Sequence, residues 1–293
     1  MLLFFDDEQA SAERLALEAN LDLARIECHR FPDGELKIRL PPTLPKQVVV
    51  LRSLHQPNEK LIELLLTCQA ARQLGAQHML LVAPYLAYMR QDMAFVAGEA
   101  ISQQIMGRFL AQLVDALITV DPHLHRVKSL TQAMPVTHAL AISAAPLLSD
   151  VIAARRVLPL LIGPDEESRQ WVSQAAARHH FEFDVCQKFR LGDHSVQITL
   201  PPRAIKGRHV VLVDDIASTG QTLSQAARLL FVAGAESVAV AVTHALFAND
   251  AVQKIREAGV LDIWSTDSIP HASNAVSLAP NLAEAMALIY EKL

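Results

Sequence analysis

The sequence of 293 residues has few aromatic residues and very few cysteines. Aromatic side chains make up 5% of the chain, and the three cysteines, Cys28, Cys68 and Cys186, form no CxxC pair. An odd number of widely spaced cysteines argues against a disulfide framework and is typical of core or incidental thiols in a reducing compartment. No apolar run approaches the roughly 20 residues that a membrane-spanning helix needs. We therefore expect neither a disulfide scaffold nor a membrane protein.

The chain also lacks the sequence motifs of several enzyme classes. It contains no GxxxxGK[ST] loop, which disfavours a P-loop kinase, and no HExxH motif, which weakens a zinc interpretation of its histidines. The segment MLLFFDDEQ is too short and too acidic for a secretory signal. Acids and bases are interspersed, with a formal net charge of −5, which argues against nucleic acid or a membrane surface as the partner. We expect a cytoplasmic protein.

Apolar runs of strand length recur along the chain, which is 51% hydrophobic. They cover residues 2–5, 48–51, 78–86, 115–120, 157–163, 209–213, 237–246 and 262–264. Most are continuous rather than alternating, as is typical of parallel strands covered on both faces. Helical periodicity lies between them, at 57–75, 99–114, 166–180 and 220–235. The alternation predicts an α/β fold with doubly wound, mostly parallel sheets.

The alternation runs twice along the chain, which predicts two halves. One series ends near Asp121 and the next begins near Val157, while residues 139–156 are rich in Ala and Ser and look helical and connecting. We place an N-terminal half at 1–142 and a C-terminal half at 143–280. The last helix, 281–293, can pack on either half.

The stretch VVLVDDIASTGQTL, residues 210–223, places two acids at the end of a predicted buried strand. Adjacent carboxylates repel each other and resist desolvation, so Asp214 and Asp215 need a functional reason. Hydroxyls and free backbone N–H groups at a helix start suit a phosphate, and such groups follow at 218–222. A plain N-cap by Ser218 or Thr219 explains one hydroxyl but not the two acids. The stretch therefore predicts a site for a phosphorylated sugar, beyond the carboxyl ends of the strands.

This stretch resembles the phosphoribosyl-diphosphate loop of type I phosphoribosyltransferases, which ribose-phosphate diphosphokinases share. Further stretches resemble the diphosphokinases specifically, in the same order along residues ~30–270. They are RFPDGELKIRL (30–40), PYLAYMRQD (84–92), GEAIS (98–102), VDPHLH (120–125), GPDEES (163–168), QKFR (187–190), THALF (243–247) and STDSI (265–269). Only Lys188 and Arg190 represent the basic loop, and Ser218 replaces the last acid of the sugar loop, as in the short-loop, archaeal-type branch.

The resemblance implies an enzyme that transfers the diphosphate of ATP to the 1-hydroxyl of ribose 5-phosphate, with two tandem sheets of the phosphoribosyltransferase kind and a site between the halves. It implies Mg²⁺ as the cofactor and a homo-oligomer as the assembly. The implied residues are Phe31, Asp33, Gly34, Glu35, Arg90, Gln91 and Asp92 for ATP; Arg190, Asp214, Asp215, Ser218, Thr219, Gly220, Gln221 and Thr222 for ribose 5-phosphate; His123, Asp165 and Asp121 for the metal; and Lys188 with Arg190 for catalysis.

The residues themselves leave some of these roles open. Asp165 suits an N-cap of the following helix as well as a metal ligand, and both roles can coexist. His123 follows a predicted strand beside an acid, although Mg²⁺ prefers oxygen and a zinc site lacks its usual motifs. Lys188 and Arg190 suit a mobile lid over phosphates, yet two cations on a solvated loop are the simpler interpretation. A turn alone explains Gly34.

Two rival functions remain at this point. A phosphoribosyltransferase would need one such half, and it gives no reason for RFPDGE or YMRQD. A non-catalytic regulatory paralogue that only binds nucleotide or a partner is expected to lose the lysine, the sugar loop or the histidine, and all three are present here.

Overall fold

The computed structural model describes residues 1–94, 96–124, 127, 129–191 and 195–291. It divides into two compact units, one formed by Met1–Ile142 with Leu278–Leu293 and the other by Ser143–Ser277. The chain therefore leaves the first unit, completes the second and returns to the first for its last helix.

Unit 1 is built on a six-stranded parallel sheet with the order β2-β1-β5-β6-β7-β8. Its strands are β1 (Leu2–Phe4), β2 (Leu23–Arg25), β5 (Gln47–Leu51), β6 (His78–Ala83), β7 (Ala116–Val120) and β8 (His138–Ile142). The helical elements of this unit are η1 (Asp6–Glu8), α1 (Gln9–Glu18), α2 (Pro57–Gln73), α3 (Ser102–Ala111), α4 (Leu130–Ala133) and α9 (Ala279–Tyr290).

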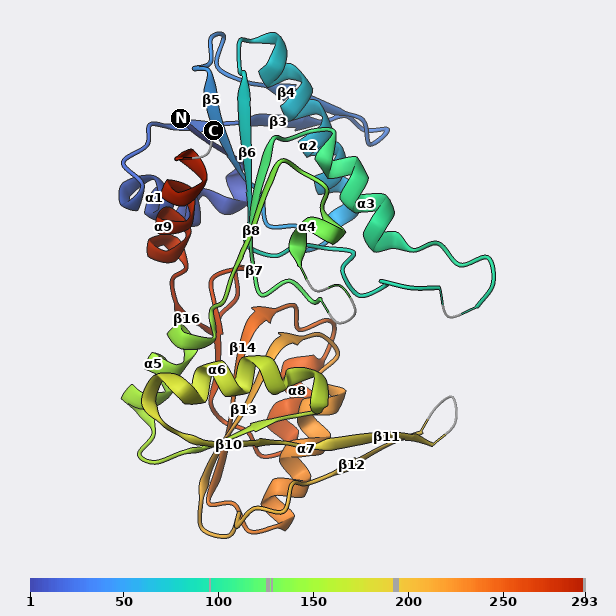
Figure 1. The fold of residues 1–293 in the computed structure, drawn as a ribbon, viewed down its shortest axis with the longest axis vertical. Coiled ribbons are helices and arrows are strands. Elements are labelled where there is room, and N and C mark those ends of the chain that lie inside the picture. Colours follow the sequence, from blue (N-terminus) through green and yellow to red (C-terminus); the bar gives the residue numbers. More distant parts are fainter. Residues whose placement is uncertain (95, 125–126, 128, 192–194, 292–293) are drawn as a thin grey trace. The chain divides into compact units, whose positions relative to one another are not determined.

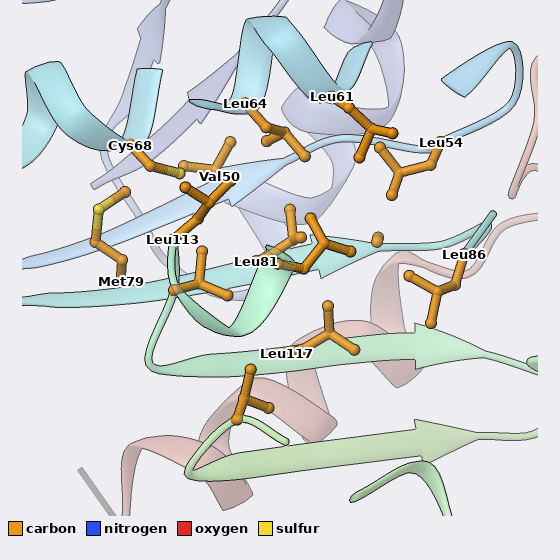
Figure 2. Close-up of a cluster of buried hydrophobic side chains, with 14 of the residues drawn as sticks. Val50, Leu54, Leu61, Leu64, Cys68, Met79, Leu81, Leu86, Leu113 and Leu117 are labelled. Carbon is orange, nitrogen blue, oxygen red and sulfur yellow. The ribbon is translucent and has the colours of Figure 1, made fainter. Parts of the chain in front are cut away.

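The apolar runs of unit 1 form its core because both faces of the central strands are covered. Side chains of one sheet face, such as Val50 and Leu81, pack against Leu61, Leu64 and Cys68 of α2 (Figure 2). On its way back from unit 2, α9 packs against α1, β7 and β8, and Figure 1 shows it in red beside the blue α1.

Unit 2 repeats this architecture with the sheet order β10-β9-β13-β14-β15-β16, again all parallel. Its strands are β9 (Leu160–Gly163), β10 (Glu182–Val185), β13 (His209–Ala217), β14 (Ser237–Ala245), β15 (Ile263–Thr266) and β16 (Asn274–Val276). Its helical elements are α5 (Ala145–Arg155), η2 (Glu166–Ser168), α6 (Arg169–His179), α7 (Gln221–Val232) and α8 (Ala251–Glu257). The helices α5 and α6 cover one face of the sheet, and α7 and α8 cover the other.

Each unit carries a two-stranded antiparallel hairpin beside its sheet. In unit 1 the hairpin joins β3 (Glu27–Arg30) to β4 (Leu36–Arg39), and in unit 2 it joins β11 (Gln187–Leu191) to β12 (Ser195–Thr199). Both hairpins follow the edge strand that comes second in their unit, so the two units share one chain order.

The interpretation of residues 139–156 as helical was wrong at its start. Residues 138–142 form β8, which pairs in parallel with β7 from Ala116↔His138 to Val120↔Ile142. The alanines here suggest a helix locally, but hydrogen bonds to the neighbouring strand decide the outcome. The helix α5 begins only at Ala145.

In the part of the chain that the structure describes, no helix is both long enough and apolar enough to cross a bilayer.

Candidate functional site

The acid pair of the sequence motif lies at the carboxyl end of β13, as expected. Asp215 is 2% exposed, and its backbone N–H donates to Asp214 Oδ1 at 3.0 Å. Burial, followed by the negative charges of Asp215 and Asp165, raises the pKa of Asp214 well above its usual range. Three carboxylates therefore act on one another at the ends of β9 and β13, which is the electrostatic cost that the sequence predicted.

The loop between β13 and α7 brings backbone N–H groups beside these acids. Gly220 adopts φ +71° as the N-cap of α7, and a Cβ there would lie 2.9 Å from Ala251 O. Both the left-handed backbone and the close approach require glycine. Ser218 and Thr222 are partly exposed, while Thr219 and Gln221 are exposed. The first turn of a helix leaves N–H groups free to bind an anion, so this loop suits a phosphate.

Asp165 proves to have two roles, one for each carboxylate oxygen. Oδ1 accepts the backbone N–H of Glu167 at 3.2 Å, which makes Asp165 the N-cap of η2. Oδ2 lies 3.3 Å from the ammonium of Lys188 on β11. The N-cap interpretation is therefore confirmed, and the second oxygen remains available for a cation. Arg190 lies two residues further along β11, where it pairs with Val196.

The predicted adenine-binding residues lie at the tip of the β3–β4 hairpin of unit 1. Phe31 is 39% exposed, and its ring meets His29 edge-on at 4.8 Å between centroids. Asp33 Oδ1 accepts the N–H of Glu35 at 3.2 Å, and Gly34 has φ +94° with open space around it. Turn geometry thus explains Gly34, in agreement with the simpler interpretation, while the side chains of Phe31 and Glu35 are exposed.

The other predicted unit 1 residues follow β6 and β7. Arg90 is exposed, Gln91 is half-buried and Asp92 is buried. Asp121 directly follows β7, is 5% exposed and has a positive φ of 35°. A left-handed backbone at a non-glycine residue costs energy and often marks a functional position. His123 is partly exposed in the same turn, while the neighbouring His125 lies outside the described residues.

Comparisons with known proteins agree with this arrangement. Residues 1–113 match the family described as the N-terminal domain of ribose phosphate pyrophosphokinase, and residues 128–279 match the phosphoribosyl transferase domain. Among its relatives, a ribose-phosphate pyrophosphokinase of Methanopyrus kandleri is 39% identical, and the match covers 93% of this chain and 94% of that one. Ribose-phosphate pyrophosphokinase 2 of Archaeoglobus fulgidus is 36% identical, with 93% of this chain and 95% of that one covered.

The chain belongs to the ribose-phosphate pyrophosphokinase family. The structure of phosphoribosylpyrophosphate synthetase from Mycobacterium smegmatis shares its fold, with a TM-score of 0.87 at 24% identity over 100% of this chain and 99% of that one. The predicted family, enzyme class and fold of two tandem α/β sheets are confirmed, and so is the similarity to archaeal members. The individual site residues stay predictions.

Magnesium, which the family resemblance implies, fits the chemistry of the unit 2 acids. Among the described residues, no group of three or more His, Cys, Asp or Glu side chains is arranged to hold a metal alone. Mg²⁺, however, is usually held by one or two carboxylates together with substrate phosphates. Burial, followed by repulsion from Asp215 and Asp165, raises the pKa of Asp214, and a divalent cation near Asp165 would relieve the repulsion.

The sequence did not predict two clusters of buried polar side chains in this member of the ribose-phosphate pyrophosphokinase family. In unit 2, Thr266 Oγ1 and Ser268 Oγ donate to Thr243 O at 2.7 and 2.9 Å, and His244 Nδ1 lies 2.9 Å from Ser268 Oγ. Because the hydroxyl proton of Ser268 goes to Thr243, His244 donates to Ser268 through Nδ1. The signal was present in THALF and STDSI, where polar residues end apolar strands.

The second missed group is a buried ion cluster in unit 1. Arg52 is 3% exposed and lies against Asp7 Oδ1 at 2.6 Å, Glu8 Oε2 at 3.2 Å and Glu63. Lys60 Nζ donates to Ser53 O at 2.8 Å. Nothing local in the sequence joins these residues, since they come from three separate elements.

Proposed function

We propose that the chain transfers the diphosphate group of ATP to the 1-hydroxyl of ribose 5-phosphate, giving phosphoribosyl diphosphate and AMP. The hydroxyl oxygen attacks the β-phosphorus and loses its proton, and the bond from that phosphorus to the oxygen shared with the α-phosphate breaks. The observation that carries the proposal is the acid pair near the end of β13 together with the loop that follows it. It occurs in a chain of which 93% matches a ribose-phosphate pyrophosphokinase.

Ribose 5-phosphate is assigned to unit 2. The carboxylates of Asp214 and Asp215 accept hydrogen bonds from ribose hydroxyls, and the loop 218–222 binds the 5-phosphate through hydroxyl and backbone N–H donors. We assign Arg190 to the same substrate because its guanidinium can hold phosphate oxygens in a fork. These roles agree with the burial of Asp215 and with the raised pKa of Asp214 near the carboxyl end of β13.

ATP is assigned to unit 1 through two segments. Phe31, Asp33, Gly34 and Glu35 at the β3–β4 tip supply a ring face and acceptors for the adenine. After β6, we assign Arg90, Gln91 and Asp92 to the nucleotide, with the exposed Arg90 as the phosphate ligand.

We expect His123 and Asp121 to hold magnesium in unit 1, and we expect Asp165 to hold magnesium in unit 2. When bound, magnesium supplies neutralisation of phosphate charge. Lys188 is the residue that we assign to the reacting β-phosphate, with Arg190 beside it in the sequence, because a positioned cation stabilises the charge that develops during transfer. A homo-oligomer and a cytoplasmic location stay predictions.

Phosphorus NMR of the protein with ATP, Mg²⁺ and ribose 5-phosphate tests this function. We expect signals of AMP and phosphoribosyl diphosphate, and we expect Lys188→Ala to slow their appearance by about 10²–10³-fold. Lys254→Ala removes a lysine that also pairs with an aspartate, Asp250, and is 39% exposed against 29% for Lys188, and it should leave the rate unchanged.

The rival functions give different results in the same experiment. The match of residues 1–113 to a pyrophosphokinase domain already disfavours a phosphoribosyltransferase, which needs only one such half. Binding of ATP and ribose 5-phosphate without any AMP would overturn the proposal and leave the regulatory paralogue.

A further inference from the structure

We propose that Asp165 is a cation-exchange position, which Lys188 occupies until magnesium takes its place, so that metal binding releases Lys188 toward the phosphates. This inference rests on the proposed function and deepens it, because it gives the metal and the lysine a fixed order of action. The contact between Lys188 Nζ and Asp165 Oδ2, 3.3 Å apart, carries it.

The two oxygens of Asp165 make the exchange competitive. Oδ1 is engaged by the backbone N–H of Glu167, a bond that fixes the carboxylate to the turn after β9. Oδ2 is the oxygen on which Lys188 lies. A magnesium ion on Oδ2 would sit about 2.1 Å away, and a second cation beside the same atom would be strongly repelled. Lys188 and the metal therefore compete for this oxygen.

The ion pair between Lys188 and Asp165 is weak, which favours its replacement by a metal ion. The side chains of Lys188 and Asp165 are 29% and 16% exposed, and an ion pair in contact with water contributes only about 0–1 kcal/mol. Asp165 also lies close enough to Asp214 to raise the pKa of that acid. A group of acids gains more from a divalent ion than from one ammonium group.

Unit 1 offers an internal comparison for this arrangement. There, Asp7 lies in the corresponding turn after the first strand, and the ammonium of Lys60 is again 3.3 Å from one carboxylate oxygen. Lys60, however, belongs to a long helix, its side chain is 8% exposed, and the buried Arg52 binds the same acid. The chain supplies permanent cations in unit 1, whereas Lys188 reaches Asp165 from a two-stranded hairpin outside the six-stranded sheet.

The order of events follows from this exchange. While Lys188 is paired with Asp165, its charge is neutralised and is not offered to a phosphate. With a metal held at Oδ2, the ammonium of Lys188 would be free to turn to the phosphates that are assigned to unit 2. The catalytic cation is thus presented together with the metal and not before it.

Mn²⁺ binding to the full chain without nucleotide tests the exchange, followed by electron paramagnetic resonance of the free ion. We expect Lys188→Met to bind Mn²⁺ about two- to fivefold more tightly than the wild type, the gain that corresponds to losing a weak competing ion pair. Asp165→Asn should lose this binding, and adding Lys188→Met to Asp165→Asn should change nothing further. Lys254→Met, with the same charge change in unit 2, should leave Mn²⁺ affinity as it is.

Equal or weaker Mn²⁺ binding by Lys188→Met, or undetectable binding by wild type and variant alike, would overturn the exchange. The outcome is separable from that of the proposed function. AMP formation with unchanged Mn²⁺ affinity rejects the exchange alone, whereas tighter Mn²⁺ binding without AMP formation keeps the exchange and rejects the reaction.

Discussion

The acids in the turn after the first strand of each unit show how one carboxylate can make two different contacts. Asp165 caps η2 with one oxygen and meets Lys188 with the other, so the N-cap and ligand interpretations of the sequence describe different atoms. In unit 1, Glu8 likewise accepts the N–H of Ser53 through Oε1 at 2.5 Å and faces Arg52 through Oε2. Residue identity alone does not separate such roles, but the atoms do.

Glu8 gives a prediction about stability and pH. Burial, the largest influence, raises the pKa of Glu8 from 4.5 to about 7, although Arg52, Lys60 and the N–H of Ser53 lower it. The folded state therefore holds a proton that the unfolded state releases between pH 4.5 and 7, and the free energy of unfolding falls as pH rises through this window. Glu8→Gln removes this loss, so we expect the variant to gain about 3 kcal/mol relative to the wild type from pH 4.5 to 7.

Urea unfolding followed by circular dichroism at several pH values measures this difference. The comparison with the wild type is essential, because burial lowers the pKa of the neighbouring His55 to about 4. The lowered pKa of His55 affects stability in the opposite direction to Glu8, because the free energy of unfolding falls as pH drops from 6.5 to 4. A difference between Glu8→Gln and wild type that does not vary with pH would contradict a protonated Glu8.

At the scale of helices and strands, long apolar runs predicted the central strands well. The strands β5, β7, β13 and β14 lie where continuous Val, Leu, Ile and Ala runs occur, because a strand buried on both faces has only apolar neighbours. Apolar runs did not predict the short or polar strands. The alanines of β8 predict a helix where the chain forms a strand, and β3, whose four residues are all exposed, has no apolar pattern.

In the candidate site, too, the sequence predicted the residues with a local pattern and not those that depend on distant contacts. Asp214 and Asp215 were found because two acids contradict the apolar pattern of their strand, and that contradiction is visible locally. The cluster around Arg52 and the bonds of His244 were not found, because they depend on side chains from distant parts of the chain meeting in space. The local sequence pattern does not show which distant side chains meet in the folded chain.

Gly220 gives a prediction for the loop before α7. Gly220→Ala forces an alanine into φ +71° and places its Cβ 2.9 Å from Ala251 O. We expect a loss of about 2–3 kcal/mol in the free energy of unfolding of unit 2, of which the left-handed backbone accounts for roughly 1–2 kcal/mol. We also expect weaker binding of ribose 5-phosphate, because the loop must shift.

Gly207→Ala is the matched control for this variant. Gly207 has nearly the same φ, +73°, but has no atom within 4 Å of an added Cβ. It should show the backbone cost alone and leave ribose 5-phosphate binding unchanged. Tryptophan fluorescence during urea unfolding and calorimetry with ribose 5-phosphate give both quantities. Equal effects of the two substitutions would show that the approach to Ala251 is unimportant.

For the whole molecule, each of the hydrophobic clusters formed by described residues draws its buried members from one unit. Both tryptophans, Trp171 and Trp264, belong to the core of unit 2, so their fluorescence reports unit 2, whereas circular dichroism reports both units. This distribution allows the stability of each unit to be followed separately in the intact chain.

The C-terminal helix α9 provides the test. Leu282 of α9 is 3% exposed, and Leu282→Ala should destabilise unit 1 by about 2–5 kcal/mol. We expect a lower midpoint by circular dichroism and an unchanged midpoint by tryptophan fluorescence. Leu230→Ala, at a fully buried leucine of α7 in unit 2, should instead lower the fluorescence midpoint. If both probes move together in both variants, the units unfold as one.

The return of the chain to unit 1 has a consequence for synthesis on the ribosome. Unit 2 occupies one continuous segment, so it can complete its fold once residue 277 has left the exit tunnel. Residues 1–142 of unit 1 are made earlier, but the surface of α1, β7 and β8 against which α9 packs stays uncovered until α9 has left the exit tunnel. The half that emerges first is therefore the half that finishes last, and its nascent form is the one that most needs protection by chaperones.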